Sequence, residues 1–556
     1  MQHPSSDMPD PPKRARAAAC VNCRVRKRRC VPAGNGRGCQ LCKSLSTPCP
    51  NEPIEATGPS SGPKQTDFRT NRDIYHDLVP LYFRYIHNVA HTMIHEASFR
   101  RRLQNGRASM LQVYAMCALA ARFSDSSHLQ GVARGKRGKM YISEAEHLTQ
   151  QSLITPSLES VQGLILIGYY YGGEGDTKAK HIYSGLARLH AEALSFPDIP
   201  EDVSPMRQEE YRRTWLSVLI ASHWTTTDMS IEPVSFIHSP DVILPAVDDV
   251  IFHSLDPEKQ QENSSLSCNM WAHMAKTLDI FNKTSVILRR LSQCLIQFSD
   301  YCIEASKLQA ALDQWEQDLP PGLAYNEANI ECLVKQGLGR TFLAMHIGLH
   351  HFRQMLFFPF LDARGDHGTP ELARRAAQCK ASANTVSDII EHSTYMDGCD
   401  LNYFIYGHIA VISSCVHLHA LLFSGDHVEL TKARKRLISN FEYLMDLKSY
   451  WPVVEYSVAR LRKFQKSCQD SMSDSFVLDN WMVRFLTEHS SNLAERQMPR
   501  SKSSGLAAVG LDSPGSFEAS YSVETGAGAH GLSDLLQDQQ VTSTALVNHA
   551  IDWLLE

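Results

Sequence analysis

Residues 20–49 read CVNCRVRKRRCVPAGNGRGCQLCKSLSTPC, and no other part of the chain has so marked a pattern. The stretch contains C-x2-C-x6-C twice, with eight residues between the copies. The cysteines are Cys20, Cys23, Cys30, Cys39, Cys42 and Cys49. Each copy offers three thiolates, whereas tetrahedral zinc takes four ligands, so six sulfurs satisfy two zinc ions only if two sulfurs bridge both ions. The repeat therefore predicts a two-zinc cluster with pseudo-twofold symmetry.

Disulfide bonds are the alternative interpretation of these cysteines. Residues 1–10 are polar and Pro-rich, so we expect no secretory signal and a reducing, intracellular setting. The chain has fifteen cysteines, and an odd total also argues against a secreted disulfide scaffold. The other nine are scattered from Cys117 to Cys468, and we expect them to be small buried hydrophobes.

The cysteine-rich segment holds too few apolar side chains to form a core. Its sizeable aliphatic residues are Val21, Val25, Val31, Leu41 and Leu45. Metal binding must therefore supply most of the free energy that folds this module.

Positive charge is confined to the first half of the repeat. Five of the six residues between Cys23 and Cys30 are basic, whereas only Lys43 is basic between Cys42 and Cys49. Arg or Lys donating to guanine O6 and N7 is the commonest specific base contact, and further cations neutralise phosphates. We expect Lys27 and Arg26 to contact bases or their immediate backbone, and Arg24, Arg28 and Arg29 to contact phosphates.

The net charge of −5 hides a strong asymmetry along the chain. Residues 1–50 carry ten Lys and Arg against two acids, a balance of +8. Residues 503–556 carry seven acids and no Lys or Arg. Such asymmetry predicts separate partners for the two ends. Lys13, Arg14 and Arg16 suit either a nuclear-localisation patch or further phosphate contacts.

The cysteine spacing and the basic run together resemble the fungal zinc binuclear cluster DNA-binding domain of the galactose-regulator type. The matching segments are residues 20–30 and 39–49. The resemblance implies a small module of two short helices and loops that holds two zinc ions, with Cys20 and Cys39 as the bridging ligands. It also implies that Lys27 reads a CGG triplet in the major groove of double-stranded DNA, and that Pro32 takes the place of the family's loop proline.

Composition divides the rest of the chain. We expect a disordered basic tail over residues 1–15, the zinc module over 16–52 and a Pro/Gly/Ser-rich linker over 53–72. Apolar periodicity then predicts a large all-helical domain over 73–490, with helices near 110–123, 158–168 and 182–194 and an interruption at 232–245. No apolar heptads follow the linker, so a monomer and a homodimer both remain open.

Several segments of this helical region resemble the fungal-specific transcription factor regulatory domain that commonly follows the zinc module. They are residues 81–83 with 94–99, then 157–164, 211–215, 240–245 and 355–361, where Phe358 stands in place of the family's arginine. The resemblance implies a regulatory or inhibitory role, in some members the sensing of a metabolite. We expect Tyr169–Tyr171 and Trp215–Trp224 to be core aromatics, and 171–175 to mark an interhelical turn.

The candidate enzyme motifs in the sequence are incomplete, and its candidate membrane-spanning runs are too short. His95-Glu96 would begin an H-E-x-x-H zinc-protease helix, but Phe99 occupies the last position. Two histidine pairs, His346 with His350 and His417 with His419, lack a third metal ligand in sequence. The apolar runs 164–171 and 355–361 are far shorter than a bilayer crossing. We expect neither an enzyme, with no catalytic residues, nor a membrane protein.

Acids interleaved with bulky hydrophobic residues mark the C-terminal tail, 498–556, which we expect to be disordered or an activation segment. The residues expected to contact coactivators are Leu535, Leu536, Trp553, Leu554 and Leu555. The sequence thus predicts a nuclear, sequence-specific activator of RNA polymerase II genes at CGG-containing promoter sites, which the resemblance associates with one metabolic or secondary-metabolite pathway. The alternative is a DNA-bound repressor or metabolite-sensing receptor whose tail is structural.

Overall fold

The computed structural model describes residues 30–31, 39–40, 42, 72–196, 198–231, 244–254, 269–362, 369–471 and 474–496. The chain divides into two compact units, Met1–Asn71 and Arg72–Glu556. Several predicted features lie outside the described residues: the tail 1–15, Cys20, Cys23, Cys49, the basic residues 24–29, most of the linker, residues 232–243 and the segment 498–556.

The second unit is all helical over its described residues, as the apolar periodicity predicts. Its first helices are α3 (Arg72–Tyr85), α4 (Glu96–Gln104), α5 (Met110–Ala120), α6 (Lys139–Ser152), α7 (Leu158–Glu174), α8 (Thr177–Ala193) and α9 (Pro205–Asp228). The later helices are α10 (Asp249–His253), α11 (Met270–Ser292), α12 (Phe298–Gln317), α13 (Glu327–Lys335), α14 (Gly339–Phe357), α15 (Pro370–Tyr395), α16 (Ile405–Phe423), α17 (His427–Tyr450), α18 (Val454–Asp470) and α19 (Asn480–Thr487).

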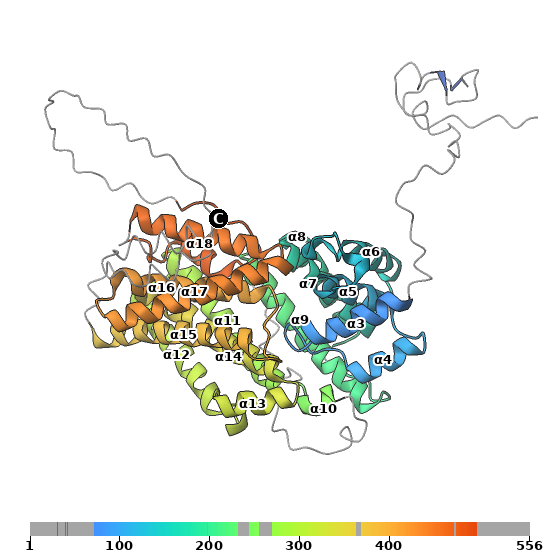
Figure 1. The fold of residues 1–556 in the computed structure, drawn as a ribbon, viewed down its shortest axis with the longest axis horizontal. Coiled ribbons are helices and arrows are strands. Elements are labelled where there is room, and N and C mark those ends of the chain that lie inside the picture. The colour runs from blue at the N-terminus through green and yellow to red at the C-terminus, as the bar shows by residue number, and fades with distance from the viewer. Residues whose placement is uncertain are drawn as a thin grey trace, which may run out of the picture. The chain divides into compact units, whose positions relative to one another are not determined.

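These helices form two groups (Figure 1). The blue-to-teal helices α3–α8 lie on one side, and the yellow-to-orange helices α14–α18 lie on the other. α9 bridges the groups, because it packs against α7 and α8 and also against α11, which in turn packs against α14. A long helix shared by both groups makes them one packed body rather than two.

α5 and α7 form the core of the first group and confirm two of the predicted helices. Both are apolar on every side and almost wholly buried, as a helix packed on all sides must be. Ser157 and Ser160 form a capping box that begins α7. The predicted turn at 171–175 is wrong in extent: α7 continues to Glu174, and only Gly175, with φ of 78°, leaves the helix.

α8 confirms the third predicted helix but buries the opposite face from the one its apolar residues suggested. Ile182 and Leu189 are more than half exposed. The buried face instead carries Lys180, Ser184 and His190. The polar face turns inward because α8 packs on α7 and α9, where these groups find hydrogen-bond partners.

Among the described residues, α16 is a longer apolar segment than the runs 164–171 and 355–361 that the sequence pointed to. This helix has 19 residues and is long and apolar enough to span a membrane. However, 89% of its most apolar window is buried inside the protein. It packs against α15, α17 and α18, so it is the core helix of the second group.

Arg213, in the 211–215 segment, is completely buried and holds α9 to its neighbours. Its guanidinium lies 2.7 Å from Glu209, on the same helix, and 2.8 Å from Asp249, at the start of α10. A third contact is donated to the hydroxyl of Thr92. This segment therefore serves packing within the helical domain.

Candidate zinc and nucleic-acid binding module

One backbone hydrogen bond joins the two halves of the cysteine repeat. The amide of Gln40 donates to the carbonyl of Val31 at 2.9 Å. Val31 directly follows Cys30, and Gln40 directly follows Cys39, so the end of the first half lies beside the start of the second. This pairing is consistent with a cluster to which both halves contribute ligands.

In the cysteine module, cysteine side chains are buried and an aliphatic side chain is exposed, the opposite of a hydrophobic core. Cys39 and Cys42 are only 2% and 1% exposed, whereas the aliphatic Val31 is 39% exposed. Gln40, directly after Cys39, and Cys42 are helical. Thiolates enclosed in this way, in a segment without an apolar core, are the donor set that zinc prefers. The described residues therefore fit the two-zinc cluster.

The scattered cysteines are structural where they are buried. Cys117, Cys379 and Cys415 are completely buried. Burial raises the pKa of Cys399 and of Cys468 to about 11, so both remain protonated thiols at neutral pH. The prediction of small buried hydrophobes is wrong for two others, since Cys294 and Cys332 are exposed.

One histidine of each pair, His346 and His419, is a hydrogen-bonded core residue. Nε2 of His346 is hydrogen-bonded to the carbonyl of Leu323, and Nε2 of His419 to that of Leu361. Burial lowers the pKa of both imidazoles to about 4, so they are neutral. No group of three or more potential metal ligands occurs within the described part of the chain.

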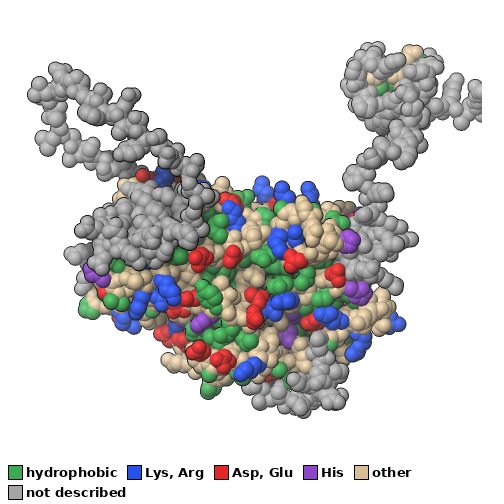
Figure 2. Space-filling model, viewed as in Figure 1, with side chains coloured by type: hydrophobic (Ala, Val, Ile, Leu, Met, Phe, Trp, Pro, Cys, Tyr) green, Lys and Arg blue, Asp and Glu red, His purple; other side chains and the backbone are tan. Residues whose placement is uncertain are grey.

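Side chains of both charges are interspersed over the visible face of the helical domain (Figure 2). Neighbouring charges form surface pairs such as Lys435 with Glu391 and Arg436 with Asp388. The described side chains of this face therefore do not form the continuous basic stripe that a nucleic-acid footprint requires, and the strongest positive charge of the sequence remains that of the cysteine module.

Two family models match the chain over separate segments. Residues 18–56 match the fungal Zn(2)-Cys(6) binuclear cluster domain, and residues 79–317 match the fungal specific transcription factor domain. The chain therefore carries both domains of the fungal Zn(2)-Cys(6) transcription factors. Its cluster domain binds two zinc ions, and the family consists of DNA-binding regulators of transcription, not enzymes.

Relatives of this kind align along most of the chain. It is 22% identical to the Zn(2)-C6 fungal-type transcription factor FTF1c of Fusarium oxysporum f. sp. lycopersici, over 73% of this chain and 47% of that protein. It is 23% identical to the uncharacterized transcriptional regulatory protein C1327.01c of Schizosaccharomyces pombe, over 56% of this chain and 34% of that one. The chain thus spans about half the length, or less, of these curated relatives. No solved structure matches it.

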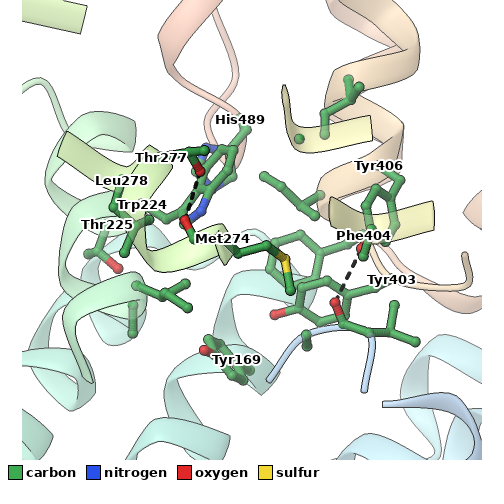
Figure 3. A pocket seen from close by; sticks show the side chains of 18 of the residues that line it. Tyr169, Trp224, Thr225, Met274, Thr277, Leu278, Tyr403, Phe404, Tyr406 and His489 are labelled. Carbon is green, nitrogen blue, oxygen red and sulfur yellow. Dashed lines mark hydrogen bonds between the residues drawn. The ribbon is translucent and has the colours of Figure 1, made fainter. Parts of the chain in front are cut away.

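The helical domain contains a cavity of about 130 Å³ that the sequence did not reveal. Tyr169, Trp224 and Tyr403 line it, from α7, α9 and the segment before α16 (Figure 3). The sequence identified Tyr169 and Trp224 as core aromatics, but not as a cavity wall. No pattern in the sequence indicated the cavity, because the apolar residues of α8 suggested a different buried face from the one in the structure.

Proposed function

We propose that the chain is a nuclear transcriptional activator that recognises CGG-type sites through its zinc module. The observation that carries the proposal is the basic run between Cys23 and Cys30, inside a metal-binding repeat whose second half has one basic residue. A metal-pinned turn restricts where these side chains can go, which favours base recognition over a merely solvated charged face.

The proposed zinc ligands are Cys20, Cys23, Cys30, Cys39, Cys42 and Cys49, with Cys20 and Cys39 bridging. The proposed base contacts are made by Lys27 and Arg26, and the phosphate contacts by Arg24, Arg28 and Arg29. The burial of Cys39 and Cys42 and the hydrogen bond between the halves support this assignment.

Substitution of Lys27 tests the DNA site. We expect Lys27→Ala to weaken binding to a CGG-containing duplex by ~1–3 kcal/mol and to relax preference at one base pair. Arg28→Ala should weaken binding to all duplexes alike and reduce the salt dependence by about one phosphate contact. Lys43→Ala, in the second half of the repeat, is the matched control and should bind as wild type. Equal loss for Lys43→Ala and Lys27→Ala would contradict the proposed site.

Activation is assigned to the acidic tail, and in particular to Leu535, Leu536, Trp553, Leu554 and Leu555. Acids keep such apolar groups in water until they bind a coactivator surface. A reporter fused to a CGG-containing promoter should lose activation when residues 530–556 are deleted, at unchanged protein level. A loss of soluble protein would instead favour the alternative, a repressor or metabolite-sensing receptor with a structural tail.

Regulation of one metabolic or secondary-metabolite pathway completes the proposal. The chain combines a zinc module, one large helical domain and an acidic tail. This domain organisation suits a regulator that couples one signal to one set of promoters. Genome-wide mapping of bound sites tests this part, because sites clustered at functionally related genes are expected, and sites scattered without such a relation would contradict it.

A further inference from the structure

The cavity in the helical domain lies where the two groups of helices meet. Its walls come from α7, α8 and α9 on one side and from α11, α14 and α16 on the other (Figure 3). A space of about 130 Å³ is close to that of an engineered apolar cavity of ~150 Å³ in another protein, which stays dry and binds benzene. The volume therefore suits a single aromatic ring with a small substituent.

The lining is mostly apolar and aromatic. Side chains that face the space include Trp224, Met274, Leu278, Phe352, Phe404 and Ile409. Water gains few partners beside such groups, whereas a ring gains dispersion contacts on each side. The lining thus favours an apolar ligand over solvent.

Two lining residues carry hydrogen-bond donors without an acceptor. The hydroxyl of Tyr169 and Nε1 of Trp271 have no partner among the described residues. Both side chains are deeply buried, at 8% and 3% exposure. Burial raises the pKa of Tyr169 above its ordinary value, so its hydroxyl remains protonated. A ligand that offers an acceptor oxygen would satisfy a group that is otherwise costly to bury.

The charged groups at the cavity are already neutralised by one another. Nζ of Lys180 lies 3.0 Å from Asp228 and 2.8 Å from Nε2 of His489. The hydroxyl of Thr277 donates to the carbonyl of Met274. These groups therefore offer no counter-charge to an ionised ligand. Burying an ionised ligand in the cavity would carry a large desolvation cost.

From this geometry we propose that the cavity binds a neutral, single-ring aromatic compound that bears an acceptor oxygen. The residues that form the site all belong to the helical domain. The bound ring contacts both groups of helices and stabilises their packing against each other.

Gly348 on α14 provides a way to fill the cavity. It lines the space, and a Cβ added to it would meet no atom within 4 Å. Gly348→Leu should therefore occupy the cavity without a clash and keep the helical domain folded. Gly185, in α8, also has no atom within 4 Å of an added Cβ but does not line the cavity, so Gly185→Leu is the matched control.

The test uses the full chain and three ring compounds of similar size: acetophenone, cumene and benzoate. Binding is followed by saturation-transfer NMR and by quenching of tryptophan fluorescence. We expect acetophenone to bind about tenfold more tightly than cumene, which lacks an acceptor, and benzoate to bind more weakly than either. Gly348→Leu should abolish binding, Gly185→Leu should retain it, and Tyr169→Phe should reduce the affinity for acetophenone alone.

Two results would overturn the proposal. The first is a wild-type chain that binds neither acetophenone nor cumene at millimolar concentration, or that binds benzoate most tightly. The second is unchanged acetophenone binding in Gly348→Leu, with circular dichroism confirming that the variant is folded.

Discussion

The ammonium of Lys180 on α8 lies 3.0 Å from the carboxylate of Asp228 at the end of α9, and both side chains are almost completely buried. The other carboxylate oxygen of Asp228 accepts the backbone amides of His489 and Ser490, at 2.6 and 2.8 Å. Burial alone would raise the pKa of Asp228, but His489, Lys180 and the two amides together hold it well below its ordinary value. This ion pair therefore joins the first helices of the domain to its last described segment.

Removing the charge of one partner of this ion pair should strongly destabilise the helical domain. Asp228→Asn leaves Lys180 buried without a counter-charge, which costs about 3–5 kcal/mol of unfolding free energy. The double variant Lys180→Met/Asp228→Asn should be more stable than Asp228→Asn alone, because no buried charge remains. Urea denaturation followed by circular dichroism measures both.

The exposed pair of Lys448 and Glu455 is the control for this prediction. Its side chains are 34% and 50% exposed at a separation of 2.6 Å. Glu455→Gln should change stability by ~0–1 kcal/mol. An effect of Asp228→Asn no larger than that of Glu455→Gln would show that the buried pair does not hold the domain together.

The same ion pair shows where prediction from sequence ends. The cysteine repeat and the apolar helices α5 and α7 could be predicted, because each depends on residues close together in the chain. The face that α8 buries could not, since Lys180 finds its partners 48 and 309 residues away. Apolar periodicity favoured Ile182 and Leu189, and long-range polar contacts decided otherwise.

The cavity is a second feature that sequence could not supply. Tyr169 is buried and Trp224 is partly buried, and aromatic residues in apolar helices are usually packed. Whether a space remains between them depends on how α9, α11 and α14 cross, which no local pattern encodes. The zinc module is the opposite case, because metal-ligand spacing is a local property of the chain.

Acid should unfold the helical domain through its buried histidines. Burial lowers the pKa of His91, His350, His351 and His417 to about 3 each. Below about pH 6.5 the unfolded chain binds protons on these imidazoles, whereas the folded chain does not. The stability that these neutral histidines allow is therefore fully present above about pH 6.5 and is lost as the pH falls toward their pKa values in the folded state. Each group costs about 1 kcal/mol per pH unit below 6.5. Thermal midpoints from about pH 7.5 to 5.5 measure the slope.

His351 offers a direct check on the histidine argument. Neither of its ring nitrogens has a partner among the described residues, and its ring stacks on Trp224 at 14°. His351→Phe should therefore preserve the packing, remove one titrating group and flatten the pH dependence by about one proton. A slope identical to wild type would mean that His351 is not held neutral by the fold.

Substitution of glycine by alanine should have opposite effects on stability at Gly138 and at Gly185. An added Cβ at Gly138, at the start of α6, would overlap the carbonyl oxygen of Ala118 and approach the ring of Tyr170. Gly138→Ala should therefore cost about 1–3 kcal/mol. Gly185→Ala, in the middle of α8 with open space around the added carbon, should instead stabilise the domain by up to about 1 kcal/mol. Thermal unfolding of both variants measures the difference, and effects of the same sign would contradict the close approach of the chain at Gly138.

Removal of zinc should separate DNA binding from the stability of the helical domain. A chelator should abolish binding to a CGG-containing duplex, because the cysteine module has too few apolar residues to fold without metal. The helical domain should keep its thermal midpoint, since no group of three potential ligands occurs in its described residues. Fluorescence anisotropy and circular dichroism on the same sample measure the two properties, and added zinc should restore DNA binding.

Single cysteine variants sharpen this last prediction. Cys39→Ser should remove DNA binding and leave the thermal midpoint unchanged, because Cys39 belongs to the first unit of the chain. Cys117→Ser should do the reverse: it places a hydroxyl in a completely buried site on α5 and lowers the midpoint without weakening DNA binding. If chelation or Cys39→Ser lowered the midpoint of the helical domain, the folding of that domain would depend on the metal cluster, contrary to the division of the chain into two units.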